Sequence, residues 1–339
     1  MTAPPRPTVV VTYPGFDPED QKTAGALGAA GFAIRLEPRY FDRSPEETLR
    51  IMADATAGIV STDPFTAGVL AGCPQLRVLA RVGVGTDTID LPAATAAGIA
   101  VTITPDTNTA AVADHTIALM LACCRRVLEN DSTVRTEEWS RGGPLTGREL
   151  TGATVGVIGL GVIGRAVAER LTGFGVRLLG ADLPGVTYAG CEQVGLDALL
   201  SQSDIVSLHV PLSPQTRGMI GQRELAMMRR GAIFINTARG GVVDETALIG
   251  ALSGGHLAGA GLDVFVQEPP LASPLLRMTN VVLSPHIAGI SISSQQSMLE
   301  MAADSILDIV AGRDCPRVVN PDAITNRRAK GKQTSGVRA

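Results

Sequence analysis

The sequence has few of the features that mark several classes of protein. Aromatic residues make up only 3% of its 339 residues, so few rings are available for stacking on bases or sugars. The longest apolar runs, such as Ile117 to Cys124, fall far short of the roughly 20 residues that a membrane-spanning helix needs. A net charge of −4 with a pI near 5.6 argues against a general nucleic-acid-binding protein. We therefore expect neither a membrane nor a nucleic acid as a partner.

The cysteines and histidines lack the spacings of metal and redox motifs. The five cysteines are scattered with no C-x-x-C pair, and the four histidines lie too far apart for a short ligand motif. Residues 1–7 include three prolines and no apolar stretch that resembles a secretory signal. The sequence thus predicts small buried thiols, no metal site and a reducing, cytoplasmic location.

Short β-branched runs alternate with Ala/Leu-rich helical patterns along most of the chain. This alternation predicts parallel βαβ units, and the length predicts two domains of about 150 residues each. One long apolar helix, capped by Thr107 or Asn108 and running to about Asn130, separates two such blocks. A last helix covers about Ser293 to Ala311. We expect an α/β protein of two doubly wound parallel-sheet domains with a cleft between them.

A glycine-rich run lies between a predicted strand and a predicted helix. Gly159, Gly161 and Gly164 form G-x-G-x-x-G, and Asp182 ends the next strand, 23 residues after Gly159. Glycines there allow a tight turn and a close approach of the backbone to a pyrophosphate, and the helix N-terminus offers free N–H groups. An acid at Asp182 would accept hydrogen bonds from ribose hydroxyls, and residues 183–188 contain no Arg or Lys for a 2′-phosphate. The run predicts NAD binding in preference to NADP.

Arg239, Glu268 and His286 each lie where a predicted strand passes into a loop. In an open parallel sheet, ligands bind outside the carboxyl ends of the strands. Arginine can hold a carboxylate in a bidentate pair, and histidine can give a proton to a carbonyl oxygen as a hydride arrives. A carboxylate beside the imidazole would orient the ring. Alone, each residue has an ordinary explanation as a surface or loop residue; their joint placement indicates hydride transfer at a carbonyl beside a carboxylate.

From about Gly83 to Gly289 the chain resembles the NAD-dependent D-2-hydroxyacid dehydrogenases, especially the phosphoglycerate dehydrogenase branch. The resemblance rests on the glycine run and on several segments in the family's order: Gly83–Asp90, Asn108–His115, His209–Leu212 with Thr216, Asn236–Glu245, Asp263–Pro269 and Ser284–Gly289. It implies a Rossmann NAD-binding domain and a flavodoxin-like substrate domain. The implied domains are 1–104 with 293–318 for substrate, 105–292 for NAD, and a flexible tail over 319–339, whose basic end from Asn326 is solvated or makes a weak anionic contact.

The resemblance also assigns roles to residues. Arg239 would bind the substrate carboxylate, His286 would donate or accept the proton, and Glu268 would be the partner of His286. The implied substrate contacts are Arg81, Val84, Gly85, Asn108 and Arg239. The implied cofactor contacts are Gly159, Gly161, Val162, Ile163, Gly164, Asp182, His209, Val210, Pro211, Thr216, Thr237, Ala238, Asp263 and Gly289, with Asp263 holding the nicotinamide carboxamide. Family members are usually homodimers through the cofactor domain, so a homodimer is expected.

The sequence departs from the family's pattern at two positions, of which the first bears on the substrate and the second is conservative. Val60 falls where phosphoglycerate-using members tend to carry an arginine, although Arg81 is retained, and Asp114 replaces a more frequent Glu. Losing one cation would weaken but not exclude a phosphorylated substrate. Because the chain has few aromatic residues and Arg239 would bind a carboxylate, we predict a small anionic 2-keto acid and its D-2-hydroxy acid as the reactants. Alternatives are a hydroxypyruvate or glyoxylate reductase, a reductase of a phosphonate 2-keto acid such as phosphonopyruvate, or a non-catalytic NAD(H) sensor. A formate dehydrogenase is disfavoured because that branch has Gln where Glu268 lies.

Overall fold

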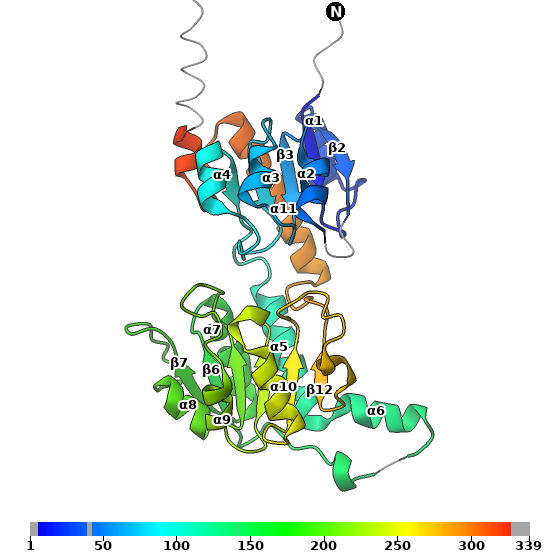
Figure 1. Ribbon diagram of the computed structural model, residues 1–339, viewed down its shortest axis with the longest axis vertical. Coiled ribbons are helices and arrows are strands. Elements are labelled where there is room, and N and C mark those ends of the chain that lie inside the picture. The colour runs from blue at the N-terminus through cyan, green and yellow to red at the C-terminus, as the bar shows by residue number, and fades with distance from the viewer. Residues whose placement is uncertain (1–5, 39–42, 140, 327–339) are drawn as a thin grey trace, which may run out of the picture. The chain divides into compact units, whose positions relative to one another are not determined.

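The computed structural model describes residues 6–38, 43–139 and 141–326, and the chain divides into two compact units. Unit 1 combines Met1–Asn108 with Ile292–Ala339, and unit 2 is Thr109–Ser291 (Figure 1). Each unit contains one parallel sheet with helices on both faces. The predicted fold class, two doubly wound α/β domains, is confirmed.

Unit 1 is built on a five-stranded sheet in the order β2-β1-β3-β4-β5. Its strands are β1 (Thr8–Val11), β2 (Ala33–Leu36), β3 (Ala57–Val60), β4 (Val78–Arg81) and β5 (Ala100–Thr102). Its helices are η1 (Gln21–Gly25), α1 (Ala26–Ala29), α2 (Pro45–Met52), α3 (Ala67–Ala71), α4 (Leu91–Ala97) and α11 (Ile292–Ala311).

Successive residues of β1 point to opposite faces of this sheet and are buried on both. Val9 and Val11 pack in a cluster with α11, whereas Val10 packs in a second cluster with α2 and α3. This two-sided burial explains the continuous β-branched runs in the sequence. A capping box begins α2, since Ser44 Oγ accepts from the Glu47 N–H at 3.2 Å and Glu47 Oε2 accepts from the Ser44 N–H at 2.9 Å.

Unit 2 is built on a seven-stranded sheet in the order β12-β11-β10-β9-β6-β7-β8. Its strands are β6 (Thr154–Ile158), β7 (Arg177–Ala181), β8 (Glu192–Gln193), β9 (Ile205–Leu208), β10 (Ile233–Asn236), β11 (Gly259–Leu262) and β12 (Val281–Leu283). Its helices are α5 (Thr109–Arg125), α6 (Val127–Arg135), η2 (Gly143–Leu145), α7 (Val162–Leu171), η3 (Thr172–Phe174), α8 (Leu196–Gln202), α9 (Gln222–Met227), η4 (Gly240–Val242), α10 (Glu245–Ser253) and η5 (Pro274–Arg277).

The two faces of this sheet carry separate cores. Val155 and Val157 of β6 pack with α5 and α7, whereas Ile158 joins the cluster formed with α8, α9 and α10. The alternation follows from the period of two along a strand. The sheet order places β6, at whose end the glycine run begins, between β9 and β7.

Two sequence predictions about element boundaries are wrong. The long helix does not run unbroken to Asn130, because Arg126 has φ of 51° and separates α5 from α6. The tail does not begin at residue 319: Asn320 is buried, and its amide bonds to the backbone of Ile99 and Val101 beside the edge strand β5. The predicted basic tail from residue 327 onward lies outside the described residues. No helix in the described part of the chain has the length and apolar character that crossing a membrane would require.

Candidate active site

Two loops of unit 2 follow strands at the carboxyl edge of the seven-stranded sheet. We call Gly159–Gly164, after β6, the glycine loop, and Ser284–Ala288, after β12, the histidine loop. All the strands that pair in this sheet are parallel, so their carboxyl ends share one edge. This is the edge at which open α/β sheets bind ligands.

The glycine loop has the geometry of a phosphate cradle. Gly159 has φ of 94°, and a Cβ at Gly164 would lie 1.9 Å from the Gly159 carbonyl oxygen. Neither position therefore admits a side chain without a shift of the backbone. A Cβ at Gly161 meets nothing within 4 Å, and Gly161 is the N-cap of the ten-residue helix α7. Open space in front of the free N–H groups of a helix is what a pyrophosphate needs.

Asp182 follows β7 and faces the glycine loop. Its Oδ2 accepts from the Leu160 N–H at 2.5 Å and its Oδ1 from the Leu183 N–H at 2.6 Å, while the residue itself is exposed. On the other side of the loop, Arg165 Nε donates to the Leu160 carbonyl at 2.7 Å. An exposed carboxylate beside a glycine cradle fits the ribose and pyrophosphate of NAD. Val162 and Ile163, which belong to the glycine loop, are also the first two residues of α7.

The loop after β9 packs against the glycine loop. The His209 N–H donates to the Ile158 carbonyl at 2.7 Å, and a Cβ at Gly159 would lie 3.0 Å from a methyl of Val210. Thr216 Oγ1 donates to the Pro211 carbonyl at 2.5 Å, which closes this loop. Burial lowers the pKa of His209 to about 3, so its ring, 2.9 Å from Ser207 Oγ, is neutral at physiological pH.

Arg239 lies in the loop after β10, which Asn236 shapes. The Asn236 amide accepts from the Ala238 N–H at 3.0 Å and donates to the Arg239 carbonyl at 3.0 Å. A Cβ at Gly240 would lie 1.9 Å from the Phe265 carbonyl carbon, so the loops after β10 and β11 are in close contact. Thr237, the remaining predicted cofactor contact here, is buried, and its hydroxyl lies 2.9 Å from that of Thr116.

Glu268 and His286 form a hydrogen-bonded pair. Glu268 Oε2 accepts from His286 Nδ1 at 2.7 Å, and Glu268 Oε1 accepts from the Phe265 N–H at 3.0 Å. Burial raises the pKa of Glu268, but the His286 hydrogen bond and charge, the Phe265 N–H and the nearby charge of Arg239 together hold that pKa below its usual value. A carboxylate can only accept, so Nδ1 carries a proton and Nε2 is the nitrogen that can exchange a proton with a ligand. The structure thus brings Glu268, His286 and Arg239 together.

Asp263 is fully buried under the histidine loop. Its Oδ1 accepts from Ser284 Oγ at 2.6 Å and from the Ile287 N–H at 2.9 Å, and its Oδ2 accepts from the Ala288 N–H at 2.8 Å. The sequence suggested only a nicotinamide contact for this carboxylate. In the structure it also fixes the loop that carries His286. Gly289, another predicted cofactor contact, directly follows this loop.

The predicted substrate residues other than Arg239 belong to unit 1. Arg81 ends β4 and is buried, and its guanidinium donates to the carbonyls of Val82 and Gly85, so it shapes its own loop. Val84 in that loop is 40% exposed, and Asn108 is half-buried. Val60 is fully buried in a core cluster, so this position supplies no cation for a phosphate.

Sequence reasoning missed His115 and Ser284 as parts of the site. His115 Nε2 lies 2.8 Å from Ser284 Oγ, although the two residues are 169 positions apart. Both residues lie in segments that carried the family resemblance, but a pair so distant in sequence gives no local signal.

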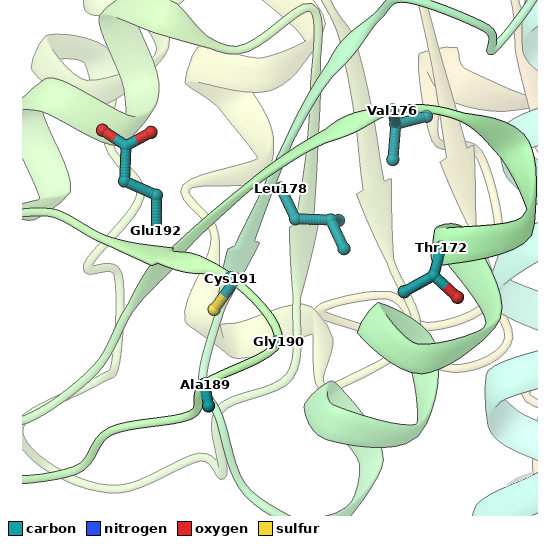
Figure 2. A pocket seen from close by; sticks show the side chains of 7 residues that line it. All are labelled: Thr172, Val176, Leu178, Ala189, Gly190, Cys191 and Glu192. Atoms are coloured by element: carbon teal, nitrogen blue, oxygen red, sulfur yellow. The ribbon is translucent and has the colours of Figure 1, made fainter.

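One hollow of unit 2 lies elsewhere. It measures about 480 Å³ and lies beside β7 and β8 (Figure 2). It is lined by Thr172, Val176, Leu178, Ala189, Gly190, Cys191 and Glu192. None of these is a predicted site residue. In the described ranges, no group of three or more His, Cys, Asp or Glu side chains is arranged to hold a metal ion.

Comparison with known proteins agrees with this geometry. Residues 117–288 match the NAD-binding domain of the D-isomer specific 2-hydroxyacid dehydrogenases. The chain is 44% identical over 301 residues to a glyoxylate reductase of Thermofilum pendens, covering 86% of this chain and 89% of that protein. It is 40% identical over 310 residues to a D-3-phosphoglycerate dehydrogenase of Mycobacterium leprae, covering 89% of this chain but only 57% of that longer protein.

Solved structures show the same likeness across both units. The D-lactate dehydrogenase of Aquifex aeolicus, in complex with NAD and lactic acid, superposes with a TM-score of 0.79 at 30% identity and covers 94% of this chain and 97% of its own. The chain therefore belongs to the D-isomer specific 2-hydroxyacid dehydrogenase family and is an NAD-dependent 2-hydroxyacid oxidoreductase.

Proposed function

We propose that the enzyme interconverts a small anionic 2-keto acid and its D-2-hydroxy acid, with His286 as the proton donor in reduction. The observation that carries this proposal is the 2.7 Å hydrogen bond between Glu268 and His286 Nδ1, with the charge of Arg239 nearby. An imidazole that a carboxylate holds beside an arginine suits a substrate that has a carbonyl next to a carboxylate.

Arg239, His286 and Glu268 have separate roles in the reaction. Arg239 binds the substrate carboxylate and keeps the carbonyl carbon in place. The glycine loop and Asp182 would hold NADH, which would supply the hydride for substrate C2. His286 Nε2 gives its proton to the carbonyl oxygen, and Glu268 stabilises the imidazolium and fixes the ring; in oxidation, His286 takes the proton back. The predicted roles of Arg81, Val84, Gly85 and Asn108 as substrate contacts remain predictions.

The test of the chemical step is His286→Ala. We expect reduction of 2-keto acids to fall by about 1,000-fold, because the proton donor is lost, while NADH still binds to the glycine loop. Steady-state rates and NADH fluorescence titration measure the two quantities separately. Full turnover by the variant would overturn the assignment of His286.

The substrate class is tested with a panel of 2-keto acids. Glyoxylate, hydroxypyruvate, phosphohydroxypyruvate and a phosphonate analogue, each at several NADH concentrations, distinguish substrates by size and charge. With Val60 in the core, we expect the phosphorylated acid to be used less well than glyoxylate or hydroxypyruvate. Failure of every 2-keto acid, with NADH binding intact, would support an NAD(H) sensor instead.

We also infer that the chain forms a homodimer through unit 2. Helix α6 projects from the body of unit 2 (Figure 1) and exposes Val127, Leu128 and Val134, which are 48%, 51% and 55% accessible, and Trp139 beyond it is 70% accessible. Apolar side chains gathered on a projecting helix favour burial against a second copy. Light scattering on the wild type and on a Leu128→Glu, Val134→Glu double variant tests this: a monomeric wild type would contradict it. The cytoplasmic location stays a prediction.

A further inference from the structure

The histidine loop is tied to helix α5 through a chain of side-chain hydrogen bonds. His115 Nε2 on α5 lies 2.8 Å from Ser284 Oγ, and Ser284 Oγ lies 2.6 Å from Asp263 Oδ1. Asp263 in turn accepts from the N–H groups of Ile287 and Ala288 at 2.9 and 2.8 Å. Three side chains from three separate segments therefore converge beneath the residue that carries the proton.

The chemistry of these groups fixes the direction of each bond. The Asp263 carboxylate has no proton to donate, so the single hydroxyl proton of Ser284 points to Asp263. Ser284 Oγ must then accept from His115, which therefore carries a proton on Nε2. His115 is the donor that starts the chain, and the loop N–H groups of Ile287 and Ala288 complete the set around the carboxylate.

The loop needs this support because of its backbone. His286 has φ of 54°, in the left-handed region that costs a side-chain-bearing residue free energy and persists only where the surroundings fix it. The His286 N–H donates to the Asp263 carbonyl at 2.8 Å, so Asp263 holds the loop through both its main chain and its carboxylate. With the backbone fixed in this way, the His286 ring reaches Glu268 at 2.7 Å.

We propose that His115 is a positioning residue for proton transfer: through Ser284 and Asp263 it holds the histidine loop in the conformation that places His286 against Glu268. The proposal rests on the proposed function, in which His286 moves the proton. Without the His115 N–H, the Ser284 hydroxyl has no donor to orient it. It can then rotate away from Asp263, and the carboxylate loses the one of its three hydrogen bonds that comes from Ser284.

The experiment compares His115→Leu, His115→Gln, Ser284→Ala and the double variant His115→Leu, Ser284→Ala. We expect kcat for 2-keto acid reduction to fall roughly tenfold in His115→Leu, because a small displacement of a proton donor slows its step. The dissociation constant of NADH should change less than about twofold, since the glycine loop is untouched. The glutamine in His115→Gln keeps an N–H donor and should restore most of kcat.

The double variant tests the route. If His115 acts through Ser284, Ser284→Ala alone lowers kcat by a similar factor and the double variant is no slower than Ser284→Ala. Losses that multiply to about 100-fold would show that His115 acts by another route and would overturn the proposal, as would an unchanged kcat in His115→Leu. His256→Leu is a matched control: it removes a ring bonded to the Met228 carbonyl at 3.0 Å, away from the histidine loop, and should leave kcat unchanged.

A measurement that needs no turnover separates this proposal from the proposed function. Hydrogen exchange of the Ile287 and Ala288 amides reports directly on the bonds to Asp263. We expect faster exchange in His115→Leu and Ser284→Ala but not in His115→Gln or His256→Leu. Unchanged exchange in His115→Leu would overturn the positioning role even if His286 proves to be the proton donor, whereas faster exchange with full turnover in His286→Ala would overturn the proposed function alone.

Discussion

The glycine loop and the histidine loop lie at the same edge of one sheet but reach their conformations by opposite means. In the glycine loop, Gly159 at φ of 94° and Gly164, whose Cβ would lie 1.9 Å from a carbonyl oxygen, depend on missing side chains. In the histidine loop, a residue with a large side chain, His286, takes a φ of 54°. There the conformation depends on polar side chains that are present, with Asp263 at the centre.

The difference follows from what each loop must present to its ligand. A phosphate is bound by backbone N–H groups, so the chain must approach it closely and side chains are in the way. A proton must come from a titratable ring, so the side chain is indispensable and its backbone has to be held from behind. The residues that determine the glycine loop therefore lie within the loop itself. The residues that determine the histidine loop lie on distant strands and helices.

The largest effect is expected from Gly164→Ala. The new methyl group collides with the Gly159 carbonyl, and moving that backbone should lower the free energy of unfolding by about 3 kcal/mol and abolish NADH binding. Gly161→Ala is the matched control, because its Cβ meets nothing within 4 Å: the melting temperature should stay unchanged while NADH binds more weakly. Thermal denaturation measures the stability of each variant, and NADH titration measures its affinity for the cofactor. Equal stability of the two variants would show that the cradle tolerates side chains.

Next in size is the effect of Asp263→Ala. The substitution leaves the Ile287 and Ala288 N–H groups buried without their acceptor, which should lower the free energy of unfolding by about 2 kcal/mol and abolish turnover. Asp263→Asn retains one acceptor oxygen and should lose less stability and less activity. Urea denaturation with activity assays checks the order of the three proteins; a fully stable alanine variant would mean that the loop holds its conformation without the carboxylate.

These two loops also show what the sequence could and could not predict. The glycine loop is a local pattern, a strand, three spaced glycines and a helix, so its place and shape were readable from residues 154–172. The support of the histidine loop joins His115 to Ser284 across 169 positions, and no local pattern encodes it. The strand-end positions of Arg239, Glu268 and His286 followed from the parallel βαβ units, whereas the order of the strands in each sheet did not.

The errors at helix and tail boundaries have the same physical origin. Helix α5 ends at Arg125 because the chain returns onto it: the Arg148 N–H donates to the Cys124 carbonyl at 2.9 Å, and a Cβ at Gly147 would lie 2.5 Å from that oxygen. The residues after Arg125 also favour a helix, but the contact of Gly147 and Arg148 with the Cys124 carbonyl ends α5 there. Asn320 is likewise fixed by the backbone of a strand 219 positions away.

A smaller effect, on the rate of catalysis and not on stability, is expected from Glu268→Gln. With its pKa held below the usual value, Glu268 is ionised at every pH above about 4.5, so a neutral amide removes a charge that the wild type always presents to His286. We expect kcat/KM for 2-keto acid reduction to fall roughly 30-fold with little change in melting temperature. Glu245→Gln is the control, because Glu245 bonds the Val266 N–H at 3.2 Å on the neighbouring loop without touching His286. A similar loss of kcat/KM in both variants would show that Glu268 only stabilises its loop.

The smallest effect concerns His209, the histidine beside the glycine loop, which has a hydroxyl and not a carboxylate as its partner. Its pKa is about 3 in the folded protein against about 6.5 when unfolded, so between these values only the unfolded chain takes up the proton. Stability from this residue is therefore lost as the pH falls from 6.5 toward 3, by at most about 1.4 kcal/mol per pH unit. Asparagine does not titrate, so the melting temperature of His209→Asn minus that of the wild type should increase as the pH falls from 7 to 4.5. A constant difference would show that His209 takes up the proton in the folded protein as readily as in the unfolded chain, and the contrast between the two loops would be weaker than their geometry indicates.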